Sequence, residues 1–404
     1  MPSRPSRVFA CGSGAAGRLA VFALTGCGSS WQPLPETTAA PAPAPAKTLY
    51  VDAPLSGPAA DEGRAMVDAV RLIVDQAGGV AGSVRVVVRA LDDGGTTTAT
   101  DPRRCSANAE RAADDPAALA VIGTYELSCS ERALAVLRRA NLWLVSPVNA
   151  SENLPGALRL APTMRDQGLA AAQFAHGLDA KRIAIVSQRS GAAGAFSSGL
   201  AHAAPVIDGA PVTQLDASAT PTEELVTELE AGQVQVVALA GSPGAWADDL
   251  LRALAQLPQT TRPAVIAPQG FDTLAFLAEA GPAAGGVRVI SRLVPAEQLG
   301  GSARSFASAY ADLHGEPPPV AVYAADAAQT VLTAAAAAGA SRAKMAGALV
   351  GVPAHDALLG HWAGTLDGGI TPRQLAVLVV DNGAFRVERV VSVTDPLPTS
   401  ADVK

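Results

Sequence analysis

The sequence of 404 residues is poor in aromatic residues, at 4%, and in charged residues, at 17%. Its formal net charge is −7 and its lysines and arginines are scattered, which argues against a nucleic-acid-binding protein. The five histidines are dispersed without zinc-ligand spacing, and no P-loop or G-x-S-x-G motif occurs. We therefore expect a protein that is not an enzyme and that needs no cofactor or metal.

The N-terminal segment has the layout of a bacterial lipoprotein signal. Three arginines precede a short apolar core, LAVFAL, and Leu24-Thr25-Gly26-Cys27 matches the lipobox, in which the cysteine is lipidated. The core is too short to span a bilayer as a helix. We predict a lipoprotein signal peptide at 1–27 and a Pro/Ala-rich tether at 28–47, with an ordinary signal peptide or a disordered tail as the alternative. Lipidated Cys27 would hold the protein at the extracytoplasmic face of the cell envelope.

Cysteine is scarce as well, with four in the chain. Cys11 lies in the signal segment and Cys27 would carry lipid, which leaves Cys105 and Cys129. A remaining pair in an oxidising compartment favours a disulfide. Two buried free thiols stay open as the alternative, and metal binding is the weakest reading because no other ligand has the right spacing.

From Thr48 onward, short apolar runs alternate with helical patterns, and a polar or glycine-rich turn follows each run. This alternation predicts an α/β protein with parallel, doubly wound sheets. The alternation restarts after about residue 160, so we expect two such sheets. Near the C-terminus, Asp381-Asn382-Gly383 predicts a β-hairpin.

The stretch from Val121 to Ser151 predicts strand, polar turn, helix, strand and polar turn. Ligands bind at the carboxyl ends of strands in such sheets, where both turns would lie. Ser128 and Ser130 could instead cap the following helix, and Asn149 could satisfy the backbone of its turn.

Several short motifs, in order, resemble the type I periplasmic binding proteins of the leucine/isoleucine/valine-binding class, the solute receptors of ABC importers. The motifs are Leu55-Ser56-Gly57-Pro58, Gly78-Gly79, Asp92-Asp93, Val121-Ile122-Gly123, Ser146-Pro147, Arg182-Ile183-Ala184-Ile185-Val186 and Tyr323. The resemblance covers about Thr48 to Val393.

This resemblance implies two Rossmann-like lobes joined by a three-segment hinge, with the ligand in the cleft. The N-terminal lobe would comprise 48–160 plus 295–355, and the C-terminal lobe 161–294 plus 356–395. It also implies a disulfide between the regions that hold Cys105 and Cys129.

The resemblance further implies that two first-lobe turns hold the carboxylate of an amino acid, although Ala150 replaces a usual threonine. The second lobe lacks the usual aromatic walls, having Gly191-Ala192-Ala193 and Ser242 there, and Gln269 stands in place of the usual acid. The predicted ligand-binding residues are Glu62, Tyr125, Glu126, Ser128, Ser130, Ser146, Asn149, Ala150, Ser151, Gln188, Ser242 and Gln269.

The leading interpretation is a monomeric, lipid-anchored solute-binding protein of an ABC importer. It would capture a small polar solute, a branched-chain amino acid or similar, by hinge closure and deliver it to the membrane subunits of an ABC permease. A neutral or acidic small molecule is a competing ligand. The alternatives are a sensory or regulatory ligand-binding module of the envelope and a degenerate scaffold that binds nothing.

Overall fold

The computed structural model describes residues 46–149, 154–188, 191–339 and 341–394. Several sequence-based predictions therefore fall outside the described residues: the signal segment with Cys27, nearly all of the tether, and the predicted ligand residues Ala150 and Ser151.

The described chain forms a six-stranded sheet in the order β2-β3-β1-β4-β5-β6. All neighbouring strands are parallel except the short β2. This is the doubly wound arrangement that the sequence predicts. The strands are β1 (Lys47–Ala53), β2 (Val80–Ala81), β3 (Val84–Asp92), β4 (Ala118–Gly123), β5 (Leu144–Ser146) and β6 (Ala157–Arg159).

Helices cover both faces of this sheet because successive strand residues point to opposite sides. Leu49 and Val51 face the core that contains helices α1 and α10, whereas Tyr50 faces α2 and α3. Both faces of the central strands are therefore buried, which explains why their sequences are continuously apolar. The helices are α1 (Ala60–Gln76), α2 (Pro102–Asp114), α3 (Leu127–Leu137), α9 (Gly301–His314), α10 (Pro319–Ala338) and α11 (Arg342–Leu349).

A second sheet of seven strands has the order β16-β15-β11-β10-β9-β7-β8. Its last five strands are parallel, and β15 and β16 form the antiparallel hairpin predicted at Asp381-Asn382-Gly383. The strands are β7 (Ile183–Ser187), β8 (Val212–Asp216), β9 (Val236–Ala240), β10 (Ala264–Pro268), β11 (Arg288–Ser291), β15 (Arg373–Asp381) and β16 (Ala384–Val393).

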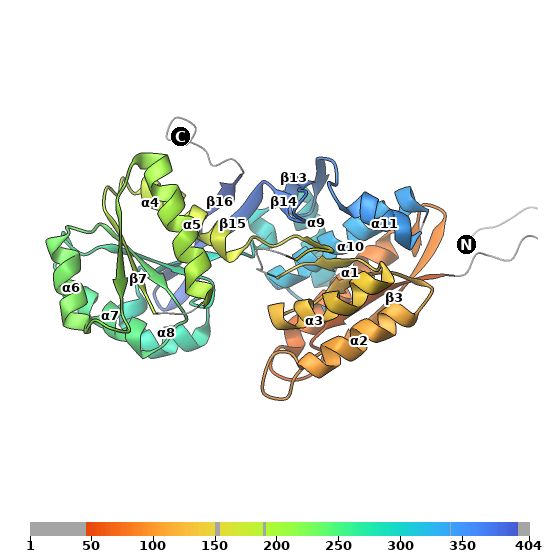
Figure 1. Ribbon diagram of the computed structural model, residues 1–404, viewed down its shortest axis with the longest axis horizontal. Helices are drawn as coiled ribbons and strands as arrows, with labels where there is room; N and C mark the ends of the chain where they lie inside the picture. The colour runs from red at the N-terminus through yellow and green to blue at the C-terminus, as the bar shows by residue number, and fades with distance from the viewer. Residues whose placement is uncertain (1–45, 150–153, 189–190, 340, 395–404) are drawn as a thin grey trace, which may run out of the picture. The chain divides into compact units, whose positions relative to one another are not determined.

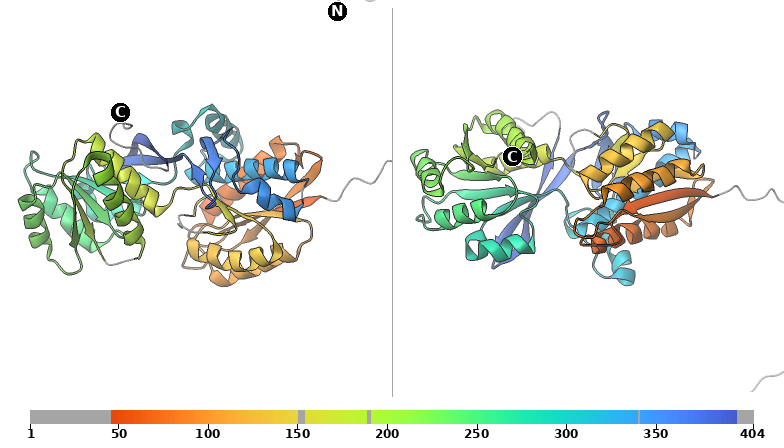
Figure 2. Two further views of the ribbon diagram at one scale, coloured as in Figure 1. Left: turned by 45° about the horizontal axis from the view of Figure 1, so that its top comes forward. Right: turned by 60° about the horizontal axis from the view of Figure 1, so that its bottom comes forward.

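Helices α4 and α5 pack on one face of this second sheet and α6, α7 and α8 on the other (Figures 1 and 2). The two helix layers bury Phe174 and Phe196 on one side and Phe271 and Phe276 on the other. The helices are α4 (Met164–Gly177), α5 (Gly191–Asp208), α6 (Thr222–Ala231), α7 (Ala245–Ala255) and α8 (Leu274–Ala280).

Three short strands form a separate sheet, β12-β13-β14. Leu358, Trp362 and Ile370 from this region belong to the core of the first sheet. Trp362 Nε1 and the Leu358 N–H both donate to the buried carboxylate of Asp326 in α10, at 3.1 and 3.0 Å. The C-terminal lobe was predicted to resume at residue 356. Because residues up to Ile370 pack with the first sheet, this packing would place the lobe boundary at about residue 371 instead. The strands are β12 (His355–Ala357), β13 (Gly360–Gly364) and β14 (Ile370–Thr371).

The chain passes three times between the two large sheets: between β6 and α4, between β11 and α9, and between β14 and β15. Three crossings are what the predicted three-segment hinge requires.

Helix α10 is the one helix among the described residues that is long and apolar enough to cross a membrane. However, 78% of that stretch is buried inside the protein. Its alanines allow close approach to α1, so α10 acts as a core helix of the first sheet.

Candidate functional site

A cavity of about 980 Å³ lies at the carboxyl ends of strands from both large sheets. Its wall takes in the turns after β4 and β5 of the first sheet and the segments after β10 and β11 of the second. Parallel sheets bind ligands at these strand ends. The lining residues are Glu62, Tyr125, Glu126, Leu127, Ser128, Val148, Asn149, Gln269, Gly270, Asp272, Thr273, Ser291, Arg292, Leu293, Pro295, Pro318, Pro319, Val320, Leu378 and Phe385.

The turn after β4 begins at Gly123, which only glycine can occupy. Its φ is +144°, and a Cβ there would lie 2.2 Å from the carbonyl oxygen of Asp52. The chain then turns into α3, whose N-cap is Glu126, so neither Ser128 nor Ser130 caps the helix. The turn thereby brings Tyr125, Glu126 and Ser128 to the cavity wall.

A buried hydrogen-bond network joins this turn to the turn after β5. The Ser130 hydroxyl lies 2.6 Å from the Thr124 hydroxyl and accepts from Asn149 Nδ2 at 2.7 Å. The Ser146 hydroxyl accepts from the Asn149 N–H at 3.3 Å. Ser130 and Ser146 are both fully buried, so these hydroxyls fix the two turns relative to each other.

From the second sheet, the segment after β10 supplies Gln269 and Asp272. The Gln269 side chain accepts the backbone N–H of Arg292 at 3.2 Å, and the Gln269 N–H donates to Gln167 Oε1 at 2.7 Å. Asp272 accepts the Gly270 N–H at 2.9 Å, which closes the turn. Gln269 thus links this turn to the segment after β11.

Arg292 follows β11 directly and is the one arginine among the lining residues. Its Nη1 donates to the carbonyl of Val148 at 2.7 Å. Tyr323 of α10 holds the same segment, since its hydroxyl donates to the Arg292 carbonyl at 3.0 Å and accepts the Val294 N–H at 3.2 Å. Burial lowers the pKa of Arg292 to about 10, so the guanidinium remains charged at neutral pH.

All four charged groups of the cavity wall affect the pKa of the Tyr125 hydroxyl. Burial raises the pKa of its hydroxyl, and the negative charges of Glu62, Glu126 and Asp272 raise it further, whereas Arg292 lowers it. Tyr125 is therefore a neutral hydroxyl, able to donate and to accept a hydrogen bond.

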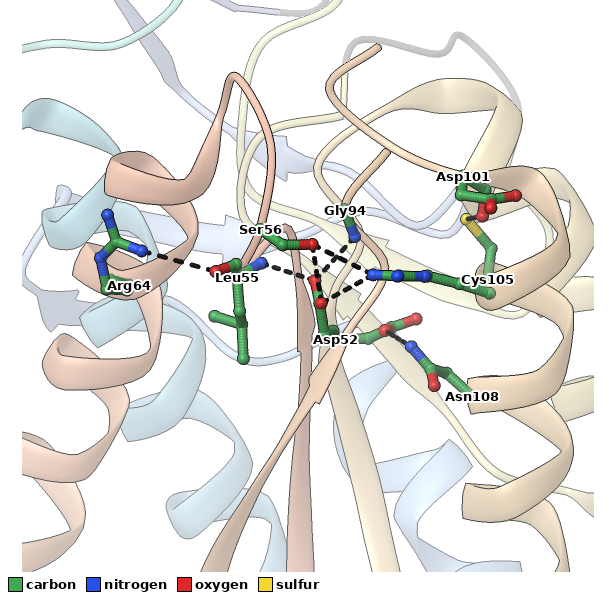
Figure 3. A network of polar contacts seen from close by, with 10 residues as sticks. Asp52, Leu55, Ser56, Arg64, Gly94, Asp101, Cys105 and Asn108 are labelled. Carbon is green, nitrogen blue, oxygen red and sulfur yellow. Dashed lines mark hydrogen bonds and ion pairs between the residues drawn. The ribbon is translucent and has the colours of Figure 1, made fainter. Parts of the chain in front are cut away.

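A second network fixes the turn after β1 to the turn after β3 (Figure 3). Asp92 accepts the N–H groups of Leu55 and Gly94, both at 2.9 Å, the Ser56 hydroxyl at 2.8 Å and Arg104 Nη1 at 2.7 Å. Burial pushes the pKa of Asp92 upward, but these hydrogen bonds outweigh it and the pKa lies below its ordinary value. The Leu55-Ser56 and Asp92-Asp93 motifs thus form one structural unit.

Next to this network, the structure pairs the two cysteines of the body. Cys105 in α2 and Cys129 in α3 have their sulfurs 2.01 Å apart and are fully buried. This is the predicted pairing, and oxidation in the cell stays a prediction. Asn108, one turn after Cys105, donates to the buried carboxylate of Asp52 at 2.7 Å.

The predicted ligand residues fall into three groups. Those in the cavity wall are Glu62, Tyr125, Glu126, Ser128, Asn149 and Gln269. Ser130 and Ser146 lie buried behind the wall. Gln188 and Ser242, after β7 and β9, do not line the cavity, and the exposed Ser242 uses its carbonyl to accept from Trp246 Nε1 at 2.9 Å.

Arg292 and Asp272 were not among the ligand residues predicted from the sequence. Both follow the carboxyl end of a strand of the second sheet, which is the signal that selected the first-lobe turns. Arg292 stands directly after an apolar strand, and Asp272 lies three residues beyond Gln269 in the same turn. Gln269 stands where the family's acid is expected, and Asp272 supplies a carboxylate to the same wall.

Comparison with known proteins agrees with this architecture. A profile of the family described as periplasmic binding protein matches residues 51–384. A search of curated proteins found no match.

Solved structures of ABC transporter proteins share the fold. The leucine-binding protein LivK of Thermotoga maritima has a TM-score of 0.64 at 19% identity, covering 85% of this chain and 98% of its own. An ABC transporter substrate-binding protein of Desulfitobacterium hafniense in complex with Leu has a TM-score of 0.70 at 16% identity, covering 85% and 100%. A solute-binding protein of an ABC transporter from R. palustris in complex with benzoate has a TM-score of 0.61 at 17% identity, covering 87% and 99%.

The family profile spans most of the chain, and the two doubly wound sheets with three crossings match the type I architecture expected from the sequence. The chain therefore belongs to the periplasmic binding protein family, with solute-binding proteins of ABC transporters as its structural relatives.

Proposed function

We propose that this protein is the lipid-anchored receptor of an ABC importer and that it holds a small polar solute in the cavity at the strand ends. The observation that carries the proposal is the cavity itself: about 980 Å³, walled by carboxyl ends of strands from both large sheets. A pocket of this size suits a small molecule. No catalytic role is assigned to its side chains.

The wall has the composition expected of a small-molecule site, in which apolar side chains surround a few polar groups. Leu127, Val148, Leu293 and Phe385 supply apolar surface. The polar groups come from both sheets. A solute that contacts both would favour the arrangement in which they close on it, with the three crossings as the hinge.

The relatives suggest where a search for the solute should start. Their solved complexes hold Leu in one case and benzoate in another, and both molecules carry a carboxylate. A branched-chain amino acid is the family's default ligand, and the panel must include aromatic acids for comparison.

Delivery would depend on the N-terminal segment and on a membrane partner. Cys27 and its tether lie outside the described residues, and the sequence predicts that they hold the domain at the membrane surface. The partner would be the membrane subunits of an ABC permease. A sensory module with the same cavity would bind its solute equally well, so transport must be measured separately from binding.

The test is a thermal-shift and equilibrium-dialysis screen of the mature chain with amino acids, amides and small carboxylates. We expect at least one to raise the melting temperature and to bind saturably. Ser128→Trp should fill the cavity and abolish the shift, whereas Ser198→Trp, on an exposed position of α5 away from the cavity wall, should keep it. A shift that survives Ser128→Trp would place the solute elsewhere, and no shift at all would favour the degenerate scaffold. Uptake by cells lacking the protein would separate importer from sensor.

A further inference from the structure

Four charged side chains line the cavity, and three of them are acids. They are Glu62, Glu126, Asp272 and Arg292, so three carboxylates face one guanidinium. Helix α1 and the turn after β4 contribute two of the acids, and the second sheet contributes the third acid and the arginine. The cavity wall therefore carries an excess of negative charge.

None of the three carboxylates forms a salt bridge among the described residues, although the charge of Asp272 acts on Arg292 and raises its pKa against the effect of burial. Glu126 accepts the Thr100 hydroxyl and Asp272 accepts the Gly270 N–H, both neutral donors. Glu62 accepts no hydrogen bond from the described part of the chain. Elsewhere in the protein, a half-buried acid such as Glu388 is paired with an arginine, Arg288, at 3.0 Å. The three cavity acids differ from Glu388 in that they form no salt bridge with an arginine or a lysine among the described residues.

Arg292 offsets only part of this charge. Its Nη1 is held by the Val148 carbonyl, and its backbone is fixed by Gln269 and Tyr323. Its buried Nε has no hydrogen-bond partner within the described residues. The protein therefore does not satisfy every N–H of this guanidinium, which lies beside a wall whose other charges are all negative.

We propose that the solute is an organic cation, with an ammonium- or guanidinium-type group bound by the acids Glu62 and Asp272 beside Tyr125. This inference rests on the proposed solute-binding function and narrows its ligand class. A purely anionic solute would find one guanidinium and three repelling carboxylates, whereas a cation compensates unpaired charge in a partly desolvated site. A carboxylate on the same solute would find the Arg292 guanidinium, which makes a basic amino acid a suitable probe.

The deciding experiment compares lysine with norleucine by isothermal titration of the mature chain. Both have a four-carbon side chain, and norleucine has a hydrogen where lysine carries its terminal ammonium. We expect lysine to bind at least about tenfold more tightly at low ionic strength, and the difference to shrink as salt is raised. Glutamate and benzoate serve as anionic probes and should bind more weakly than lysine.

Two variants locate the effect. Glu62→Gln and Asp272→Asn should each weaken lysine binding by about five- to tenfold, because each removes one carboxylate, and should weaken the binding of norleucine, which carries one ammonium fewer, by a smaller factor. Glu279→Gln, on an exposed position of α8 outside the cavity wall, is the matched control and should change neither. Unliganded melting temperatures of all variants show whether folding is intact.

The outcomes separate this inference from the function on which it rests. Norleucine, glutamate or benzoate binding as tightly as lysine would overturn the cation inference and leave the solute-binding function standing. Binding of none of the four, together with no hit in the wider screen, would overturn both. Unchanged lysine affinity in both acid variants would also overturn the inference.

Discussion

Asp93 is a buried acid without a cation, and it lies against the paired cysteines. It follows β3, is fully buried, and its Oδ2 lies 3.2 Å from Cys129 Sγ, while its Oδ1 has no hydrogen-bond partner in the described residues. Burial, together with the neighbouring charge of Asp92, raises the pKa of Asp93 to about 7. Burial likewise raises the pKa of Asp52 well above its ordinary value. The buried residues behind the cavity wall thus include two acids, Asp52 and Asp93, whose pKa values are raised by burial.

This predicts that stability falls as pH rises through neutrality. The folded pKa of Asp93 exceeds the ordinary value of 3.8, so the stability it contributes is complete below about pH 4 and is lost as pH rises through about 7. Asp93→Asn should raise the free energy of unfolding at pH 8 by on the order of 2 kcal/mol and have little effect near pH 4.5. Urea denaturation across this range measures it, with the exposed Asp249→Asn as control. An equal effect at both pH values would contradict the prediction.

At the scale of elements, the crossing segments are joined by a buried ion pair. Arg373 Nε at the start of β15 lies 3.0 Å from Asp166 Oδ2 in the first turn of α4, and the two side chains are 7% and 6% exposed. Asp166 also forms a capping box with Thr163, accepting its N–H at 2.7 Å and donating to its hydroxyl at 3.1 Å. Helix α4 therefore begins at Met164, ahead of its first buried apolar side chain, Leu169, because the cap stabilises a polar first turn.

We predict that removing one partner of this pair is costly. Arg373→Met should lower the free energy of unfolding by about 3–5 kcal/mol, because it leaves the Asp166 carboxylate buried and without its guanidinium. The double variant Asp166→Asn with Arg373→Met should recover part of the loss. Arg386→Met, in an exposed pair with Asp381, is the control and should cost under about 1 kcal/mol. Urea denaturation measures all of these, and an Arg373→Met cost as small as that of the control would refute a structural role for the pair.

At the scale of the whole molecule, the proposed function depends on the folded domain and on an N-terminal segment that lies outside the described residues. The predicted tether at 28–47 is proline- and alanine-rich, a composition that favours extended chain and would hold the domain away from the bilayer. Stable anchoring requires more than one acyl chain, which a diacylated cysteine provides.

We predict that Cys27→Ser releases the protein from the membrane without affecting solute binding. Detergent phase partition of cells that express each form measures this. The unsubstituted protein should enter the detergent phase, and the Cys27→Ser variant should stay in the aqueous phase. The melting temperature and solute affinity of the domain should stay the same, because Cys27 precedes the folded unit. Retention of the variant in the detergent phase would mean that another feature anchors the protein.

The sequence alone determined the repeated alternation of strand and helix, the two sheets and the hairpin at Asn382, and it favoured a pairing of Cys105 with Cys129 over two free thiols. These depend on local periodicity, on turn residues and on counting, all of which a single chain displays. It also placed Tyr125, Glu126 and Asn149 in turns at strand ends, and these residues line the cavity.

Only the tertiary structure decided which strand ends converge. Ser242 and Gln188 follow strands as Asp272 does, yet only Asp272 lines the cavity. Whether Ser130 faces the cavity or the interior depends on where the Asn149 amide lies, and no local pattern encodes that contact. Arg292 became part of the site because the turn after β5, far away in sequence, presents the Val148 carbonyl to it. Long-range packing sets such contacts, and so the balance of charge in the cavity wall was visible only in the folded protein.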